Sequence, residues 1–198
     1  MPRKKQFDEV AVLYQIMNHF WHKGYHATKM DELSELTSLT KTSLYNAFGD
    51  KKALFRKATD CYCDDALRNG LSKMELGLPA SKNLRALLIN YIFDEDKQQL
   101  SQGCLLVNSA LEFAEHDKEL HAYVSKKLID INLTIIAYFQ MEQASGRISK
   151  ILTAKQLGDY VITIIQGLRV QVRIETNPEN LVDIIDTSLL LIQQQEIS

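Results

Sequence analysis

The fold is decided by residues 20–55, which read FWHKGYHATKMDELSELTSLTKTSLYNAFGDKKALF. Gly24 follows an amphipathic run over 7–23 and predicts the end of a first helix. Thr28 predicts the cap of a second, short helix, and Thr40 predicts the cap of a third helix after a tight turn. Two short helices joined by such a turn form a helix-turn-helix, whose second helix enters the major groove of DNA.

Polar and basic side chains concentrate around the third of these helices. Lysines neutralise phosphates, hydroxyls bind phosphate oxygens, and an Asn side chain can pair with adenine. Each residue also has a plain structural explanation: Thr28 as a cap, Tyr45 as a core residue, Lys51 as a solvated helix start. The candidate DNA-binding residues are Thr28, Lys29, Lys41, Thr42, Ser43, Tyr45, Asn46 and Lys51.

Charge is distributed unevenly along the chain. Residues 1–57 carry ten Lys and Arg against six Asp and Glu, a formal charge of +4, although the whole chain carries −2. The remaining residues therefore carry −6. A basic N-terminal segment on an acidic body is typical of a DNA-contacting domain joined to a domain with another role, although short basic stretches are usually only solvated surface.

The rest of the chain predicts further helices and an all-α fold of about nine helices. Pro (3) and Gly (8) are scarce, which leaves few turns for a many-stranded sheet. A fourth helix is expected to end near 69–70 and to join the two parts of the molecule rigidly. We expect a helix-turn-helix domain over 1–55 and a helical inducer-binding and dimerisation domain over 56–198. Longer helical patterns follow over 83–97, 103–115, 118–143, 153–175 and 178–195.

Composition and motifs argue against other classes of protein. The longest apolar runs are about five residues, far short of a membrane span, and the basic start lacks the apolar core of a secretory signal. Three cysteines without framework spacing suit a reducing compartment, so we expect a cytoplasmic protein with no cofactor and no metal. The absence of paired Glu-x-x-His, Gly-x-Ser-x-Gly and phosphate-loop motifs disfavours a helical-bundle enzyme. A pure scaffold, the other alternative, would not need a helix-turn-helix.

Residues 20–33 and 39–55 resemble the signature of TetR/AcrR-type repressors: an aromatic residue, three others, Gly, an aromatic residue, two others and Thr. Ser38 and Thr42 depart from it, because the family often carries Gly at both positions. The resemblance implies that Thr28, Lys41, Tyr45 and Lys51 touch DNA. It also implies a homodimeric repressor that a small organic inducer releases from a palindromic operator on double-stranded DNA.

The second half resembles the family more weakly, at 103–112 and 165–173. There the resemblance implies an inducer pocket, for which the candidates are Tyr91, Leu105, Asn108, Glu112, Tyr123 and Arg169. It further implies that the last two helices form a dimer interface. These helices could instead complete the chain's own core. The candidate interface residues are Leu157, Val161, Ile164, Leu168, Leu181, Ile184, Ile185, Leu189 and Ile192.

Cys104 supports a different kind of sensor within the same family. It falls at an expected helix start, where the helix dipole lowers a thiol pKa. Related electrophile and oxidant sensors carry a reactive Cys in a similar Gly-Cys-Leu setting. A small buried core residue is the plainer interpretation of Cys104.

Overall fold

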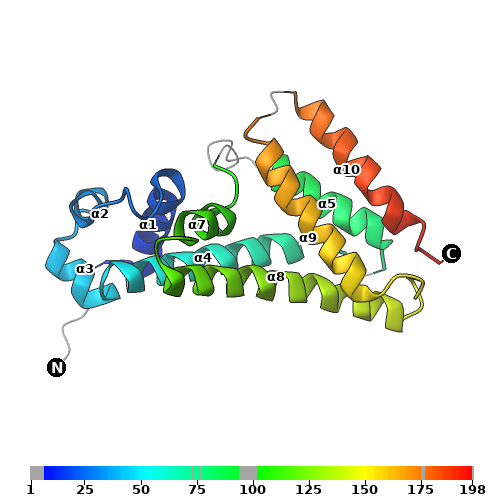
Figure 1. Ribbon diagram of the computed structural model, residues 1–198, viewed down its shortest axis with the longest axis horizontal. Coiled ribbons are helices and arrows are strands. Elements are labelled where there is room, and N and C mark those ends of the chain that lie inside the picture. The colour runs from blue at the N-terminus through cyan, green and yellow to red at the C-terminus, as the bar shows by residue number, and fades with distance from the viewer. Residues whose placement is uncertain (1–6, 73, 76, 94–101, 175–176, 198) are drawn as a thin grey trace. The chain divides into compact units, whose positions relative to one another are not determined.

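The computed structural model describes residues 7–72, 74–75, 77–93, 102–174 and 177–197. As the sequence predicted, these residues form helices joined by turns. Within these ranges the only β pairing is one isolated bridge, between Ile148 and Glu196. The helices, shown in Figure 1, are α1 (Glu9–Lys23), α2 (Met30–Thr37), α3 (Lys41–Phe48), α4 (Lys51–Ser72), α5 (Ala80–Phe93), α7 (Leu105–Phe113), α8 (Lys118–Ala144), α9 (Ala154–Gln171) and α10 (Pro178–Gln193).

Packing divides the chain into two compact units. Unit 1 holds residues 1–65 and 105–124, and unit 2 holds 66–104 and 125–198. This division differs from the expected boundary after residue 55, because α7 and the start of α8 pack with the helix-turn-helix. Both α4 and α8 run from one unit into the other. The assignment of separate functions to 1–55 and 56–198 stays a prediction.

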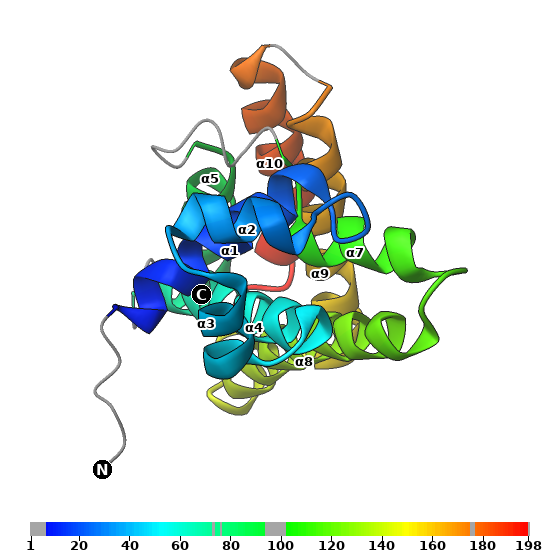
Figure 2. The same ribbon diagram turned by 90° about the vertical axis from the view of Figure 1, so that its left-hand side faces the viewer.

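Unit 1 is built around the helix-turn-helix, whose α2 and α3 are labelled in Figure 2. Four aromatic rings lock its centre: Phe55 lies edge-on to Phe20 at 5.3 Å, to Tyr25 at 5.2 Å and to Phe113 at 5.3 Å between ring centroids. Such pairs contribute about 0.5–1.5 kcal/mol each beyond the area they bury. Because Phe113 belongs to α7, this cluster joins α7 to the helix-turn-helix.

Local capping sets the helix ends in unit 1. Gly24, at φ 85°, ends α1, and the Thr40 hydroxyl accepts the Ser43 N–H to begin α3, as predicted. Ser38 adopts a left-handed conformation, φ 56°, in the turn where relatives often carry Gly. The prediction that Thr28 caps α2 is wrong. Lys29 occupies that position without a side-chain cap bond, while the Thr28 hydroxyl donates to the Gly24 carbonyl at 2.7 Å.

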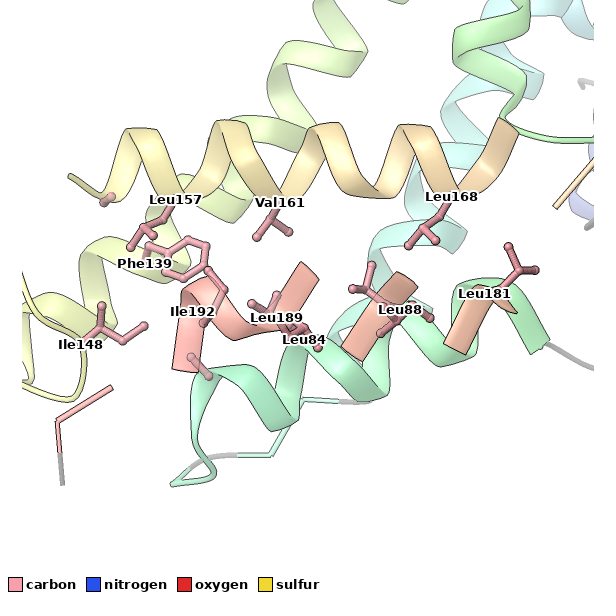
Figure 3. Packing of buried hydrophobic residues seen from close by; sticks show 13 residues of the cluster. Leu84, Leu88, Phe139, Ile148, Leu157, Val161, Leu168, Leu181, Leu189 and Ile192 are labelled. Atoms are coloured by element: carbon pink, nitrogen blue, oxygen red, sulfur yellow. The ribbon is translucent and has the colours of Figure 1, made fainter. Parts of the chain in front are cut away.

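Unit 2 has its own core between α5, α9 and α10. Leu157, Val161 and Leu168 of α9 are each at most 3% exposed and pack in one cluster with apolar residues of α5 and α10 (Figure 3). Gly158 permits a close approach to α8, because a Cβ there would lie 2.4 Å from Cγ1 of Ile136. The core of unit 2 is therefore shared by α5, α9 and α10, with α8 packed closely against α9.

Candidate nucleic-acid interface and ligand cavity

The third helix presents one polar face and one buried face. Leu44 and Phe48 are 0% and 2% exposed and anchor α3 in unit 1. The opposite face carries exposed Thr42, Tyr45 and Asn46, one turn apart in the pattern i, i+3, i+4. These short polar and aromatic side chains are of the kind that reach base edges and phosphates. The expected recognition face is thus accessible.

The basic residues around this face differ in what already holds them. The Lys41 ammonium forms an ion pair with Asp31, which raises the pKa of Lys41. The Lys51 ammonium lies over the Tyr25 ring, 4.3 Å from its centroid, and burial lowers the pKa of Lys51 while Glu112 opposes this shift. Phosphate would have to compete with Asp31 for Lys41 and with an aromatic ring for Lys51.

Two predicted DNA contacts are occupied inside unit 1. Thr28 is 1% exposed, with its hydroxyl proton on the Gly24 carbonyl. The Ser43 hydroxyl is paired with that of Thr40 at 2.9 Å. Lys29 is exposed. Thr28 therefore serves the turn between α1 and α2 in this structure, because its short side chain is enclosed there.

Glu112 of α7 holds that same turn from the other side. Its carboxylate accepts the backbone N–H of Tyr25 at 3.0 Å and that of His26 at 2.6 Å. Gly24 leaves room for it, since a Cβ there would lie 3.2 Å from Oε2 of Glu112. Hydrogen bonds to an ionised acceptor are about twice as strong as neutral ones. Glu112 thus fastens α7 to the segment that leads into α2.

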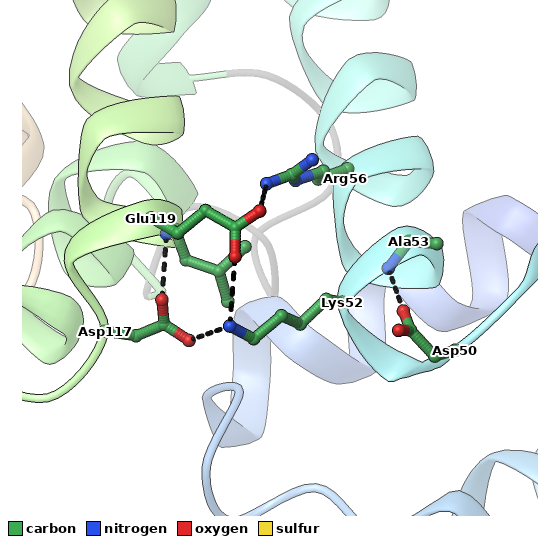
Figure 4. A network of polar contacts seen from close by, with 7 residues as sticks. Asp50, Lys52, Ala53, Arg56, Asp117 and Glu119 are labelled. Carbon is green, nitrogen blue, oxygen red and sulfur yellow. Dashed lines mark hydrogen bonds and ion pairs between the residues drawn. The ribbon is translucent and has the colours of Figure 1, made fainter.

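A second polar contact, which we call the Lys52 clamp, ties α4 to the start of α8 (Figure 4). The Lys52 ammonium lies 2.8 Å from Asp117 and 3.3 Å from Glu119, and Arg56 donates to Glu119 at 2.6 Å. Hydrogen bonds from Lys52 are the main reason why the pKa values of both carboxyls are lowered and the pKa of Lys52 is raised. Asp50 separately accepts the Ala53 N–H at 2.8 Å and begins α4.

Unit 2 contains an apolar cavity of about 120 Å³. It is lined from four helices: α4, α5, α8 and α9. Its walls are mainly aliphatic, including Leu84, Leu87, Ile131, Val161 and Ile165. A ligand site of this composition selects for shape and apolar surface.

The six predicted inducer-binding residues do not line this cavity. Glu112 and Tyr123 belong to unit 1, where Glu112 binds the turn and the Tyr123 hydroxyl donates to Asp60 at 2.7 Å. Leu105 and Asn108 also belong to unit 1, and Leu105 is 2% exposed. Arg169 of unit 2 donates to the Gly103 carbonyl at 3.3 Å. Tyr91 lies in α5, but its side chain is outside the described part of the structure.

Most of the predicted dimer-interface residues are buried in the core of unit 2 itself. Seven of the nine are at most 4% exposed, because α10 packs its apolar stripe on α5 and α9 packs its stripe beside it. Ile164 is partly buried against the same core. Ile184 is 40% exposed. The buried seven are Leu157, Val161, Leu168, Leu181, Ile185, Leu189 and Ile192.

Other predicted features can be placed briefly. Cys104 directly precedes α7 and is partly buried, and the thiol-sensor alternative stays a prediction. Over the described ranges, no group of three or more His, Cys, Asp or Glu residues is placed to hold a metal ion. None of the described helices is both long and apolar enough to cross a membrane.

The cavity-lining residues and the Glu112 contact were missed by sequence reasoning. Leu84, Ile131 and Val161 look like ordinary core positions, because only the packing of four helices shows that they surround a space. Glu112 lies 87 positions from Tyr25, and no local pattern connects them.

Comparison with known proteins agrees with this architecture. Residues 13–58 match the family described as bacterial regulatory proteins, tetR family, and residues 80–187 match the tetracyclin repressor-like C-terminal domain. The chain is 27% identical over 194 residues to the HTH-type transcriptional repressor ComR of Escherichia coli K12, covering 96% of this chain and 90% of that one.

Solved structures share the fold. A cysteine mutant of the TetR-family regulator CifR, in complex with 26-bp operator DNA, superposes with a TM-score of 0.84 at 24% identity, covering 95% of this chain and 98% of that one. A TetR-family regulator from Cytophaga hutchinsonii does so with a TM-score of 0.78 at 18% identity, covering 98% and 100%. Because the C-terminal match alone covers more than half of the chain, the protein belongs to the tetR family of bacterial regulatory proteins and is a DNA-binding transcriptional regulator rather than an enzyme.

Proposed function

We propose that the protein is a homodimeric repressor that reads a palindromic operator with α3 and is released by a small organic inducer bound in unit 2. The observation that carries the proposal is the exposed polar face of α3, with Thr42, Tyr45 and Asn46 opposite a buried anchor. The names of two relatives support the sign of regulation: ComR is a repressor, and IcaR of Staphylococcus aureus is a negative regulator.

The DNA part of the proposal can be tested with sites that the protein itself selects from a random-sequence pool. Asn46→Ala should weaken binding about 5- to 150-fold and relax the preference at one base pair of each half-site, since a bidentate base contact contributes about 1–3 kcal/mol. Lys29→Ala should weaken binding to all sequences and reduce the slope of log affinity against log salt by about one unit. Lys150→Ala, an exposed lysine of unit 2, is the matched control.

Wild-type affinity and sequence preference in the Asn46 variant would contradict this assignment of α3. A salt slope that falls equally in the Lys150 control would contradict the assignment of Lys29. Both measurements need only gel-shift titrations at several salt concentrations.

The dimer is proposed on the apolar residues that the core of unit 2 leaves outside. Val170 of α9 is 51% exposed, and Ile184 and Leu190 of α10 are 40% and 52% exposed. A palindromic operator has two-fold symmetry, which a protein dimer with two-fold symmetry matches. Apolar residues that point outward from the last two helices offer a self-complementary surface for such a dimer.

Charge on this surface should separate the subunits without unfolding them. We expect Val170→Glu combined with Ile184→Glu to give a folded monomer by light scattering after size exclusion. Ile151→Glu, at a position 83% exposed and outside both helices, should stay dimeric. A dimer of wild-type mass from the double variant would place the interface elsewhere. Ile185 is unsuitable for this test, because it is 0% exposed and a charge there would disrupt the core.

A further inference from the structure

The cavity of unit 2 has walls that are poorly suited to a charged ligand. Leu84, Leu87, Ile131, Val161 and Ile165 supply most of its surface, and none of its described lining residues carries a charge. An ion transferred into such surroundings without a partner loses its hydration and gains nothing in return. The lining therefore selects against carboxylates and amines.

Two hydroxyl-bearing residues line the cavity, and neither supplies a charge that would pair with an ionised ligand. The Thr134 hydroxyl donates to the Asp130 carbonyl at 3.1 Å, so its proton is already used. The Tyr138 hydroxyl oxygen is buried and has no hydrogen-bond partner among the described residues. Burial raises the pKa of Tyr138 to about 12, and the nearby Asn83 side chain opposes this shift. The Asn83 side chain is itself bonded to Glu75: its oxygen accepts the Glu75 N–H and its nitrogen donates to the Glu75 carbonyl. Tyr138 therefore stays a neutral phenol at physiological pH.

The volume of the cavity limits the size of the ligand. Its volume of about 120 Å³ is close to the volume of about 150 Å³ of an apolar cavity that accepts benzene. We infer that the inducer of this regulator is an uncharged, largely hydrocarbon molecule about the size of one aromatic ring. This inference rests on the proposed ligand response, but binding to the cavity can be measured without DNA.

Thermal unfolding of the full chain at pH 7 with two probes of one ring each, toluene and benzoate, provides the test. Toluene at a hundredfold excess over its dissociation constant should raise Tm by roughly 5–10 °C, and benzoate at the same concentration should not raise it. Ala66→Phe places a ring in the cavity wall and should abolish the toluene shift. Ala137→Phe, at an exposed position of α8 outside the lining, is the matched control and should keep it.

Thr134→Phe is a second filling variant at an exposed lining position, where a larger side chain is compatible with folding. A benzoate shift as large as that of toluene would overturn the inference, and so would a toluene shift that persists in folded Ala66→Phe or Thr134→Phe protein. Absence of a toluene shift in the wild type would overturn it as well. Failure of the proposed function shows itself separately, as absence of sequence-selective DNA binding by the ligand-free protein in gel shifts.

Discussion

Replacing Glu112 by Leu should destabilise unit 1. The carboxylate accepts the N–H groups of Tyr25 and His26 at 3.0 and 2.6 Å, from a helix 87 positions away in the sequence. Leu has a similar size but no acceptor. The variant therefore removes two charge-assisted hydrogen bonds and keeps the apolar contacts of the side chain.

The magnitude follows from the burial of the two donors. Tyr25 is 8% exposed, so its N–H would be left without a partner, at a cost of about 1–3 kcal/mol. His26 is exposed and water can replace its bond, so this loss adds about 0.5–1 kcal/mol. Together these give about 1.5–4 kcal/mol, which for a chain of this size lowers Tm by roughly 3–15 °C. Glu112→Gln keeps one acceptor oxygen and should lie between wild type and the Leu variant.

The chain offers a local probe for this measurement. Trp21 is the only tryptophan, it is 7% exposed, and it belongs to unit 1. Its fluorescence during urea unfolding therefore reports on the unit that Glu112 stabilises. Glu115→Leu, at an exposed position just after α7, is the matched control and should unfold like wild type. A Glu112→Leu protein whose Trp21 transition coincides with wild type would refute the proposed role of this carboxylate.

Four further outcomes can be stated briefly. Gly158→Ala should lower the free energy of unfolding by about 1–3 kcal/mol because its Cβ meets a neighbouring helix. Gly167→Ala, where nothing lies within 4 Å, should raise it by about 0.5–1 kcal/mol in urea titrations. Asp31→Asn should increase operator affinity about two- to fivefold in gel shifts, because it releases Lys41 from an exposed ion pair, and Lys41→Ala should cancel this gain. The Lys52 clamp lowers the pKa values of Asp117 and Glu119 on folding. Its stabilisation is therefore present above the unfolded carboxyl pKa near 4 and is lost as the pH falls through the lower folded values. Lys52→Ala should make unit 1, followed by Trp21 fluorescence, lose less stability between neutral and acidic pH than the wild type, and an unchanged loss would contradict the role of the clamp.

Much of unit 1 could be predicted from the sequence because local interactions set it. Gly24 ends α1 through its positive φ, and Thr40 and Asp50 begin α3 and α4 through side-chain bonds to N–H groups three residues on. Asn177 likewise begins α10 by accepting the Glu179 N–H. Each of these signals lies within a few residues of the structure that it determines. The residues that resemble the tetR family signature also lie in this locally determined segment.

The sequence predicted side-chain exposure where helix periodicity decides it, but it did not predict contacts with residues that are distant in the chain. Thr42 and Asn46 lie on the outer face of α3, opposite Leu44, as a helical wheel requires. Thr28 instead turned inward to the Gly24 carbonyl, since a hydroxyl that can cap a helix can equally bond an earlier turn.

An amphipathic pattern by itself determines that a helix has an apolar face, but not what covers that face. The stripes of α9 and α10 are the same whether they bury against α5 or against a second subunit, and only the tertiary structure assigned Leu157 and Ile185 to the chain's own core. In the same way, the sequence predicted an all-helical fold and the exposed, polar outer face of α3. Only the packing of the helices decided which faces surround the cavity and which distant carboxylate meets the turn at Tyr25. The physical reason is that the free energy of burial depends on contacts between residues that lie far apart in the sequence.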